Sequence, residues 1–329
     1  MMQRSRMLLA KAIVFLLALG LAGNAAAQAT DYPSRAVKMI IPYAPGGTDD
    51  VTGRIVAKKL TEMWGQPVVV ENRPGVGGTI AMGLTAKSPP DGYTIAVGDS
   101  GQLSIAPSLY AKLPYQPLRD LMPVANVALV PYVLAVNPGV PAKTVRELIE
   151  LAKAKKGSMT YGSTGTGGST DLAMRLFKSL AGVEILQVPY KGVSPYVTAL
   201  LAGEIDMVIT DLGIVAPHAK AGKLRLLATA SSKRPKTAPQ LPTLAEAGVE
   251  GYAVDFWAGI VAPAGIPGNV MEKLNSGIVS ALKAADVQQR FDELGYVLIG
   301  GTPEQFAATI RADIEKYARV IKNANISPQ

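Results

Sequence analysis

Apolar, β-prone runs alternate with amphipathic helical runs along almost the whole chain. Strands are expected at residues 37–41, 68–71, 94–97, 124–127, 132–136, 160–161, 185–189, 207–210, 224–229, 258–262 and 297–299. Helices are expected at residues 50–64, 78–87, 144–155, 170–181, 195–202, 215–221, 244–247, 269–284, 285–293 and 303–324. Such alternation is typical of sheets built from βαβ units, so the pattern predicts an α/β fold.

The last of these helices has the clearest start. Thr302 is the expected N-cap, Pro303 the first helical residue and Gln305 the capping-box partner of Thr302. Its apolar positions recur at helical spacing and predict one buried face. They are Phe306, Ile310, Ile314, Tyr317 and Ile321.

Two proline-rich stretches mark places where the chain is expected to cross between domains. Residues 113–123 precede a run of apolar strands that begins near residue 131, and the loop 234–242 precedes a second crossing near residues 248–252. Two crossings imply a discontinuous first lobe, made of residues 28–130 and 253–329. Residues 131–252 would form the second lobe, inserted into the first. No internal repeat is evident.

The first 27 residues have the pattern of a secretory signal peptide. Arg4, Arg6 and Lys11 give a charged start, and the apolar stretch 12–21 is too short for the ~20 residues of a spanning helix. Alanines at 25–27 offer a cleavage site. The chain has no cysteine, which excludes disulfides and a lipoprotein anchor. The periplasm is the expected location.

The net charge adds little to the expected fold and function. The chain carries 33 basic and 25 acidic residues, for a net charge of +8. Without the three basic residues of the signal peptide, 30 basic residues remain against 25 acidic ones, a net charge of +5. These charges are spread along the sequence without a Lys/Arg block, so nucleic-acid binding is not expected.

A glycine pair, Gly46 and Gly47, separates the first strand from the first helix. The first N–H groups of a helix have no internal partner and lie at the positive end of the helix dipole, so they suit a carboxylate. An isolated glycine pair would also fit an ordinary βα turn. Similar glycine loops recur at 72–79, 161–170 and 188–195, and α/β folds bind ligands where such helix starts gather. The recurrence favours an anion site.

Other kinds of site fit the sequence poorly. The loop 162–170 has Thr170 where a dinucleotide motif needs its last glycine, and no lysine follows to make a P-loop. Ser100 lies in a Gly-Asp-Ser-Gly sequence, but the chain has one histidine, His218, and nothing places it beside Ser100. The loop 98–102 is therefore expected to contact a ligand. One histidine, no cysteine and no closely spaced acids predict no metal site and no cofactor. Asp49 and Asp50 fit a helix cap as well as a ligand contact.

The order of short motifs along the mature chain resembles the tripartite tricarboxylate transporter substrate-binding receptors, also called Bug proteins. Each motif is weak alone, and the ordered set is specific. The matching segments are Tyr32-Pro33, Pro45-Gly-Gly-Thr-Asp49 with Arg54, Glu71-Asn-Arg-Pro-Gly-Val-Gly-Gly78, Pro90-Asp-Gly-Tyr-Thr94, Tyr161-Gly-Ser-Thr-Gly165 with Gly167, Val188-Pro-Tyr-Lys-Gly192, Gly203-Glu-Ile-Asp206, Gly222-Lys-Leu-Arg225, Trp257-Ala-Gly259 and Pro263-Ala-Gly-Ile-Pro267.

The resemblance implies a type II periplasmic binding-protein fold, with two α/β lobes that close on a small carboxylate. It implies a monomer without a cofactor, in which the Pro-Gly-Gly and Tyr-Gly-Ser-x-Gly loops hold the carboxylate through backbone donors and bridging water. The chain departs from the family at Asp171, where a histidine is usual. An acid there removes a neutral or cationic group near the expected ligand.

The resulting hypothesis is a periplasmic receptor that captures a small organic carboxylate, either a di- or tricarboxylate or an aromatic acid, and delivers it to integral membrane permease subunits. Phe256 and Trp257 would form an aromatic wall or belong to the core. The expected ligand-binding residues are Tyr43, Gly46, Gly47 and Thr48 from one lobe, Ser163, Thr164, Gly167 and Ser169 from the other, and Ser100, Gln102, Tyr190, Asp211 and Trp257 around the rest of the ligand.

Three alternatives stay open at this point. An orphan receptor would report the ligand to a sensor kinase without transport. An enzyme on the same fold is disfavoured, because no His, Cys and acid constellation is present. A structural or adhesive periplasmic protein would leave the glycine loops without a use.

Overall fold

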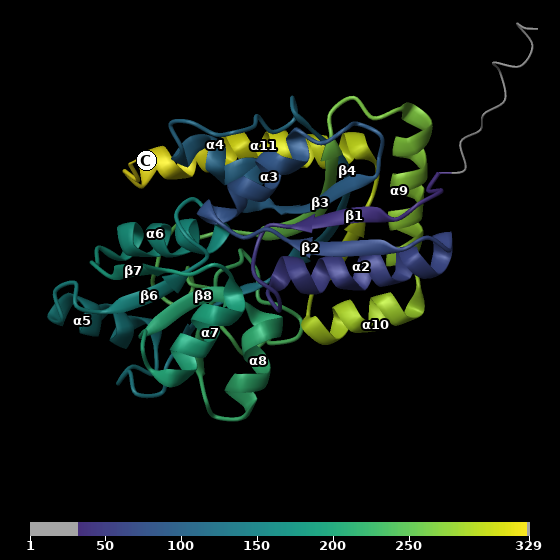
Figure 1. Cartoon of the computed structure of the whole chain (residues 1–329). Coiled ribbons are helices and arrows are strands. Elements are labelled where there is room, and N and C mark those ends of the chain that lie inside the picture. Colours follow the sequence, from purple (N-terminus) through teal and green to yellow (C-terminus); the bar gives the residue numbers. More distant parts are fainter. Residues whose placement is uncertain (1–31, 328–329) are drawn as a thin grey trace, which may run out of the picture. The chain divides into compact units, whose positions relative to one another are not determined.

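Two β-sheets organise residues 35–327 in the computed structural model (Figure 1). The structure describes residues 32–327, and the predicted signal peptide, residues 1–27, lies outside them. Residues 32–34 belong to a separate N-terminal unit. Within the described part of the chain, no helix combines the length and apolar character needed to cross a membrane.

The first sheet has six strands in the order β11-β4-β10-β3-β1-β2. They are β1 (Val37–Ile41), β2 (Val68–Asn72), β3 (Thr94–Asp99), β4 (Leu121–Val130), β10 (Phe256–Pro263) and β11 (Val297–Gly300). Strand β1 pairs in parallel with β2 and β3, whereas β10 runs antiparallel between β3 and β4. A strand from late in the sequence thus lies inside a sheet that begins near residue 37.

Helices cover both faces of this sheet, as Figure 1 shows. On one face, α2 (Thr48–Trp64), α9 (Gly268–Leu282) and α10 (Ala285–Leu294) contact one another. On the other lie η2 (Val76–Gly78), α3 (Thr79–Ala86), the π-helical turn η3 (Gly101–Ile105), α4 (Ala106–Leu109) and α11 (Pro303–Asn323). Trp257 belongs to the core on this second face, with its ring centroid 5.2 Å from that of Phe306.

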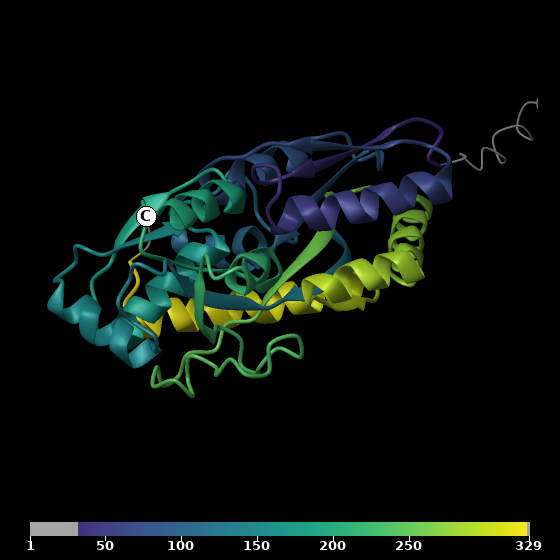
Figure 2. The same cartoon turned by 90° about the horizontal axis from the view of Figure 1, so that it is seen from below.

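The second sheet has five strands in the order β7-β6-β8-β5-β9. They are β5 (Tyr132–Val136), β6 (Thr160–Ser163), β7 (Leu186–Pro189), β8 (Met207–Asp211) and β9 (Arg225–Thr229). The helices between them are α5 (Val145–Ala154), α6 (Ser169–Ala181), α7 (Val193–Ala202) and α8 (Leu212–Lys220). Every strand of this sheet lies within residues 132–229, and the teal and green ribbons of Figures 1 and 2 follow it.

The predicted alternation of strands and helices is confirmed, with exceptions that have physical causes. Residues 244–247 form turns and no helix, because four residues give too few hydrogen bonds to offset helix nucleation. The expected loop 98–102 instead ends β3 and enters η3. Strand β4 begins three residues before the expected 124, despite Pro123. Because β11 pairs only with Asn126 to Leu129, the missing N–H of Pro123 interrupts no ladder on that side.

Helix α11 begins as the sequence indicates. Thr302 is the N-cap, and its side chain and that of Gln305 form the full capping box. Along the apolar stripe, Ile314 is partly buried and packs against the core. The other four members of the stripe are fully buried.

Candidate functional site

Two glycine pairs lie where the first sheet meets the second. Gly47 is the N-cap of α2 and Gly168 is the N-cap of α6. The β1–α2 loop contacts the segment that enters α7, since the Ala44 N–H donates to the Lys191 carbonyl at 3.0 Å. A Cβ on Gly46 would lie 2.7 Å from the Ser194 Oγ, so a larger residue does not fit without displacement.

Gly77 makes a close contact between the two sides. Its φ of +59° favours glycine, and a Cβ there would lie 2.6 Å from the Thr166 carbonyl oxygen and 3.1 Å from the Gly168 nitrogen. Nearby, the Tyr110 hydroxyl donates to the Thr166 carbonyl. The sequence predicts Gly77 only as part of a glycine loop and does not single out Tyr110. Their shared partner, Thr166, lies 56 residues after Tyr110 and further still from Gly77.

The two glycine pairs belong to a short motif that occurs in both segments. Gly46 and Gly167 begin segments in which an aspartate follows four residues later and an arginine eight residues later. Asp50 accepts from the Gly46 N–H at 2.9 Å and pairs with Arg54 at 2.9 Å. In the second segment, Asp171 and Arg175 reproduce these contacts, at 3.0 Å and 2.9 Å.

The repeat gives Asp171 a structural explanation. Its carboxylate is fully buried, accepts from the Gly167 N–H and the Tyr161 hydroxyl, and pairs with Arg175. The negative charge expected to disturb an anion site is therefore balanced within the helix. Because the Gly167 N–H donates to Asp171, and the Gly46 N–H donates to Asp50, neither N–H is available to a ligand. The backbone donors left to a ligand are those of the first helical turn.

A network of side chains connects the β1–α2 loop with the end of β3. The Tyr43 hydroxyl donates to the Gly77 carbonyl at 3.1 Å and accepts from the Gln102 Nε2 at 2.6 Å. The Gln102 Oε1 accepts from the Asp99 N–H at 2.8 Å. Both side chains are buried, so the sequence-predicted Tyr43 and Gln102 form one hydrogen-bonded unit beneath η2.

Two further contacts join predicted residues from opposite sides. The Thr48 Oγ1 donates to the Asp211 Oδ2 at 3.0 Å. The Ser169 hydroxyl lies 3.2 Å from the Tyr132 hydroxyl and 3.5 Å from the Asp99 Oδ2. The first turns of α2 and α6 are thus each connected to the end of a strand in the other sheet.

Buried carboxylates lie close to these contacts. Asp49, Asp99 and Asp211 are 2%, 5% and 0% exposed. Burial raises the pKa of Asp99 and the pKa of Asp211 to about 6. Burial, followed by the charges of Asp99, Asp211 and Asp50, raises the pKa of Asp49 well above its ordinary value. The ionised form of each is disfavoured in the folded protein.

These pKa values predict a pH-dependent stability. Between pH 6 and pH 8 the folded protein releases protons from Asp99 and Asp211, whereas unfolded aspartates, with pKa near 3.9, are already ionised. The folded state therefore binds more protons, and the free energy of unfolding falls as the pH rises. We expect a loss of about 1 kcal/mol for the two groups, or roughly 2–4 °C in melting temperature. Differential scanning calorimetry of the ligand-free protein measures this. A flat or rising melting temperature would contradict it, and Asp99→Asn should reduce the slope.

A cleft of about 690 Å³ opens beside Gly77, between η2 and the loops that precede α6 and α7. Two predicted residues, Thr164 and Tyr190, line it, together with Val76, Tyr110 and Lys191.

A family described as the tripartite tricarboxylate transporter family receptor (TctC) matches residues 52–326. The chain belongs to this receptor family.

Three solved structures are similar to the receptor over most of its length. The periplasmic binding protein BugD is 32% identical, with a TM-score of 0.87 over 91% of this chain and 100% of BugD. Rpa4515 of R. palustris, solved with adipate, is 35% identical, with a TM-score of 0.87 over 91% and 100%. MatC from Rhodopseudomonas palustris, with bound malate, is 30% identical, with a TM-score of 0.85 over 88% and 100%.

These findings confirm the predicted periplasmic binding-protein fold with two α/β lobes. The chain is a periplasmic solute-binding receptor of the TctC and Bug family, which is a receptor family and not an enzyme family.

The receptor does not bring all predicted site residues to the same place. Trp257 lies in the core, where its indole N–H donates to the Asp313 Oδ2 at 2.6 Å. The Ser163 hydroxyl accepts hydrogen bonds from groups on its own side of the boundary, the Gly165 N–H and the Gln187 Nε2. Ser100 is fully buried, and its hydroxyl has no hydrogen-bond partner among the described residues.

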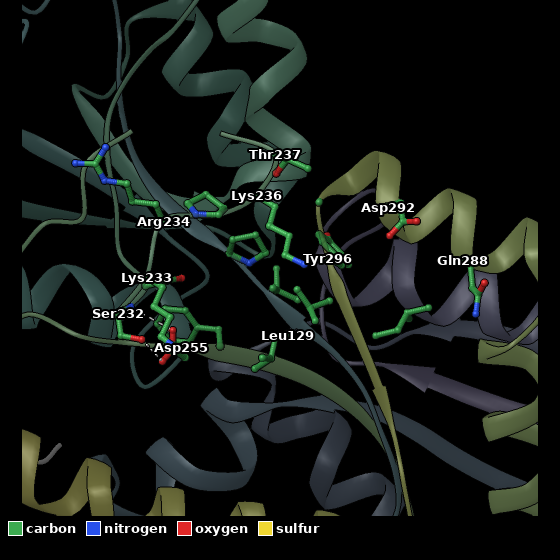
Figure 3. Close-up of a pocket in the computed structure, with 18 residues that line it drawn as sticks. Leu129, Ser232, Lys233, Arg234, Lys236, Thr237, Asp255, Gln288, Asp292 and Tyr296 are labelled. Carbon is green, nitrogen blue, oxygen red and sulfur yellow. Dashed lines mark hydrogen bonds between the residues drawn. The ribbon is translucent and has the colours of Figure 1, made fainter. Parts of the chain in front are cut away.

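The receptor has a second hollow, of about 680 Å³, lined by residues of β4, α10, β11 and the loop after β9 (Figure 3). In Figure 3 the side chains of Lys233, Lys236 and Tyr296 surround it. The Ser232 hydroxyl donates to the Asp255 Oδ2 at 3.1 Å at its edge. None of the residues predicted to bind the ligand lines this hollow.

Proposed function

We propose that the receptor captures a small organic carboxylate between its two lobes and delivers it, as a monomer, to integral membrane permease subunits. The observation that carries this proposal is that two glycine-pair helix starts lie at the boundary between the sheets, with Gly47 against Val193 and Gly168 against Gly77. Each offers N–H groups without intrahelical partners at the positive end of a helix dipole. Two such ends together suit one carboxylate.

The lobes of the proposal are residues 28–130 with 253–329 and residues 131–252. The division of strands between the two sheets supports these boundaries. Closure about the two crossings would enclose the ligand. The contacts of Gly77 and Tyr110 with Thr166 would hold the closed arrangement, and the closed lobes would present one face to the permease.

The proposed ligand contacts follow from the geometry. The amides of the first turns of α2 and α6 would hold the carboxylate. Around them we place the side chains that lie at the boundary or line the cleft. We leave out Trp257, which lies in the core of the first sheet, and Ser163, whose hydroxyl bonds within its own sheet region. The retained residues are Tyr43, Gly46, Gly47, Thr48, Ser100, Gln102, Thr164, Gly167, Ser169, Tyr190 and Asp211.

The similar structures support a carboxylate of small size. Rpa4515 was solved with adipate and MatC with malate, both dicarboxylates. Backbone donors recognise the carboxylate and little else, so the remainder of the ligand is set by side chains of this chain.

A thermal-shift screen of the mature protein tests the proposal. We expect at least one aliphatic or aromatic mono-, di- or tricarboxylate to raise the melting temperature, because a ligand that binds only the folded state stabilises it. The amide of the same molecule, which carries no charge, should give no shift. If no carboxylate raises the melting temperature of folded protein, the proposal fails. Loss of uptake of the identified ligand in cells that lack the chain would test delivery to the permease.

A further inference from the structure

Three buried carboxylates converge behind the glycine pairs. Asp49 lies in the first turn of α2, Asp99 ends β3, and Asp211 ends β8. None is more than 5% exposed. Among the charged groups around Asp49, Asp99 and Asp211 have the largest effect on its pKa. The three strand and helix ends therefore bring acidic side chains, whose ionisation a cation would favour, to one region of the lobe boundary.

The three carboxylates differ in how many hydrogen bonds they accept. Asp211 accepts from the Thr48 and Tyr296 hydroxyls and from the Gly213 N–H. Asp99 accepts from the Gly101 N–H and lies 3.5 Å from the Ser169 hydroxyl.

Asp49 has no such support. Within residues 32–327, neither of its carboxylate oxygens has a hydrogen-bond partner, and the hydroxyl of Ser100 is also without one. A buried carboxylate left unpaired is strongly unfavourable, so Asp49 ionises here only beside a donor or cation that the described residues do not supply.

Within residues 32–327, no cationic side chain forms an ion pair with these three acids. The arginines nearest the glycine pairs, Arg54 and Arg175, are paired with Asp50 and Asp171. Among the ion pairs of the described residues, none includes Asp49, Asp99 or Asp211.

The surrounding elements supply aromatic hydroxyls and no base. Tyr43 follows β1 and Tyr132 begins β5, and the charges of Asp99 and Asp49 act on both phenols. Burial raises the pKa of each phenol well above its ordinary value, so both stay neutral. No group of acidic or histidine side chains in the described structure is arranged to hold a metal ion. An organic cation fits this region better than a metal.

We infer that the ligand is an amino carboxylate, which carries a protonated amine as well as its carboxylate, and that the amine is held by Asp49. The inference rests on the proposed capture of a carboxylate by the two helix starts. An ammonium group supplies both the charge that balances the acids and the N–H donors that the Asp49 oxygens lack. Asp49 follows Thr48 directly in the first turn, so the amine and the carboxylate of the ligand are separated by a few bonds.

Matched pairs of acids test the inference by isothermal titration calorimetry on the mature protein. The pairs are succinate and aspartate, glutarate and glutamate, and propionate and alanine, which differ only in the amine. We expect the amino acid of at least one pair to bind at least tenfold more tightly than its partner. Asp49→Asn should reduce that preference to less than threefold by weakening the amino acid, while the acid without an amine binds as before or better.

Glu150→Gln is the matched control, since it removes an exposed acid on α5, away from the lobe boundary. It should leave the preference unchanged. Equal or weaker binding of the amino acids in every pair overturns the inference and leaves the capture of a carboxylate intact, as does a preference that survives Asp49→Asn. If no member of any pair binds to folded protein, and the wider carboxylate screen also fails, the proposed function itself is overturned.

Discussion

Replacing Gly77 with alanine is expected to weaken ligand binding roughly 100-fold. The new Cβ would lie 2.6 Å from the Thr166 carbonyl oxygen and 3.1 Å from the Gly168 nitrogen. Both are backbone atoms of the opposite lobe, which cannot rotate away as a side chain can. Overpacking of this kind costs about 1–3 kcal/mol, and each 1.4 kcal/mol is about tenfold in affinity. The proposed closed arrangement loses this energy, and isothermal titration calorimetry measures the result.

Gly65→Ala is the matched control for this variant. Gly65 ends α2 with a φ of +65°, close to the +59° of Gly77, but no atom lies within 4 Å of its Cβ position. Both variants place an alanine in the left-handed region of backbone conformation, which costs about 1–2 kcal/mol. They should therefore lose similar thermal stability. Only Gly77→Ala should lose affinity. Equal affinity in the two variants would show that this contact plays no part in ligand capture.

The second large effect is expected on stability, from Arg175→Ala. Arg175 is the cation that balances the fully buried Asp171, and its own side chain is only 19% exposed. Removing one partner of a buried pair leaves an uncompensated charge and costs about 3 kcal/mol. For a protein of this size that corresponds to a loss of roughly 6–12 °C in melting temperature, which calorimetry at pH 7 detects.

The repeated motif supplies the control for this variant. Arg54 holds the equivalent position beside Asp50, but its side chain is 52% exposed, and the Asp50 carboxylate also accepts from the Asn72 amide. Water can replace much of what Arg54 provides, so Arg54→Ala should cost about 1 kcal/mol or less. Asp171→Asn in the Arg175→Ala background should restore part of the lost stability. Equal losses for the two arginines would contradict the assigned burial.

The fold was largely predictable from local signals. Periodicity and glycine or proline breaks located most strands and helices, and the capping box of Thr302 fixed the start of α11. Local signals failed where tertiary contacts decide the conformation. Residues after Gly98 looked like a loop because glycine and serine dominate them, yet packing against α11 and α6 supports the turn η3 there. Pro123 lacks the N–H that a central strand needs. Strand β4 still includes Pro123, because β11 does not pair with that part of β4.

The candidate site was predictable only in part, for a related reason. The glycine pairs and Thr48 carry a local signal, because helix starts need particular residues. Asp49 looked like a helix cap, and its lack of a partner depends on groups from β3 and β8 that no local pattern brings to it. The pairing of Asp171 with Arg175 was visible as a spacing shared with Asp50 and Arg54, and the comparison of the two segments would have revealed it.

The sheet order of the first lobe has a consequence for how the protein assembles. Strand β10 lies between β3 and β4, so β3 and β4 do not pair with each other. A growing or translocating chain cannot complete this lobe until residues 256–263 are available. All five strands of the other lobe, by contrast, lie within residues 132–229. The half of the site carried by α6 thus precedes the half carried by α2 in order of assembly, although α2 is made first.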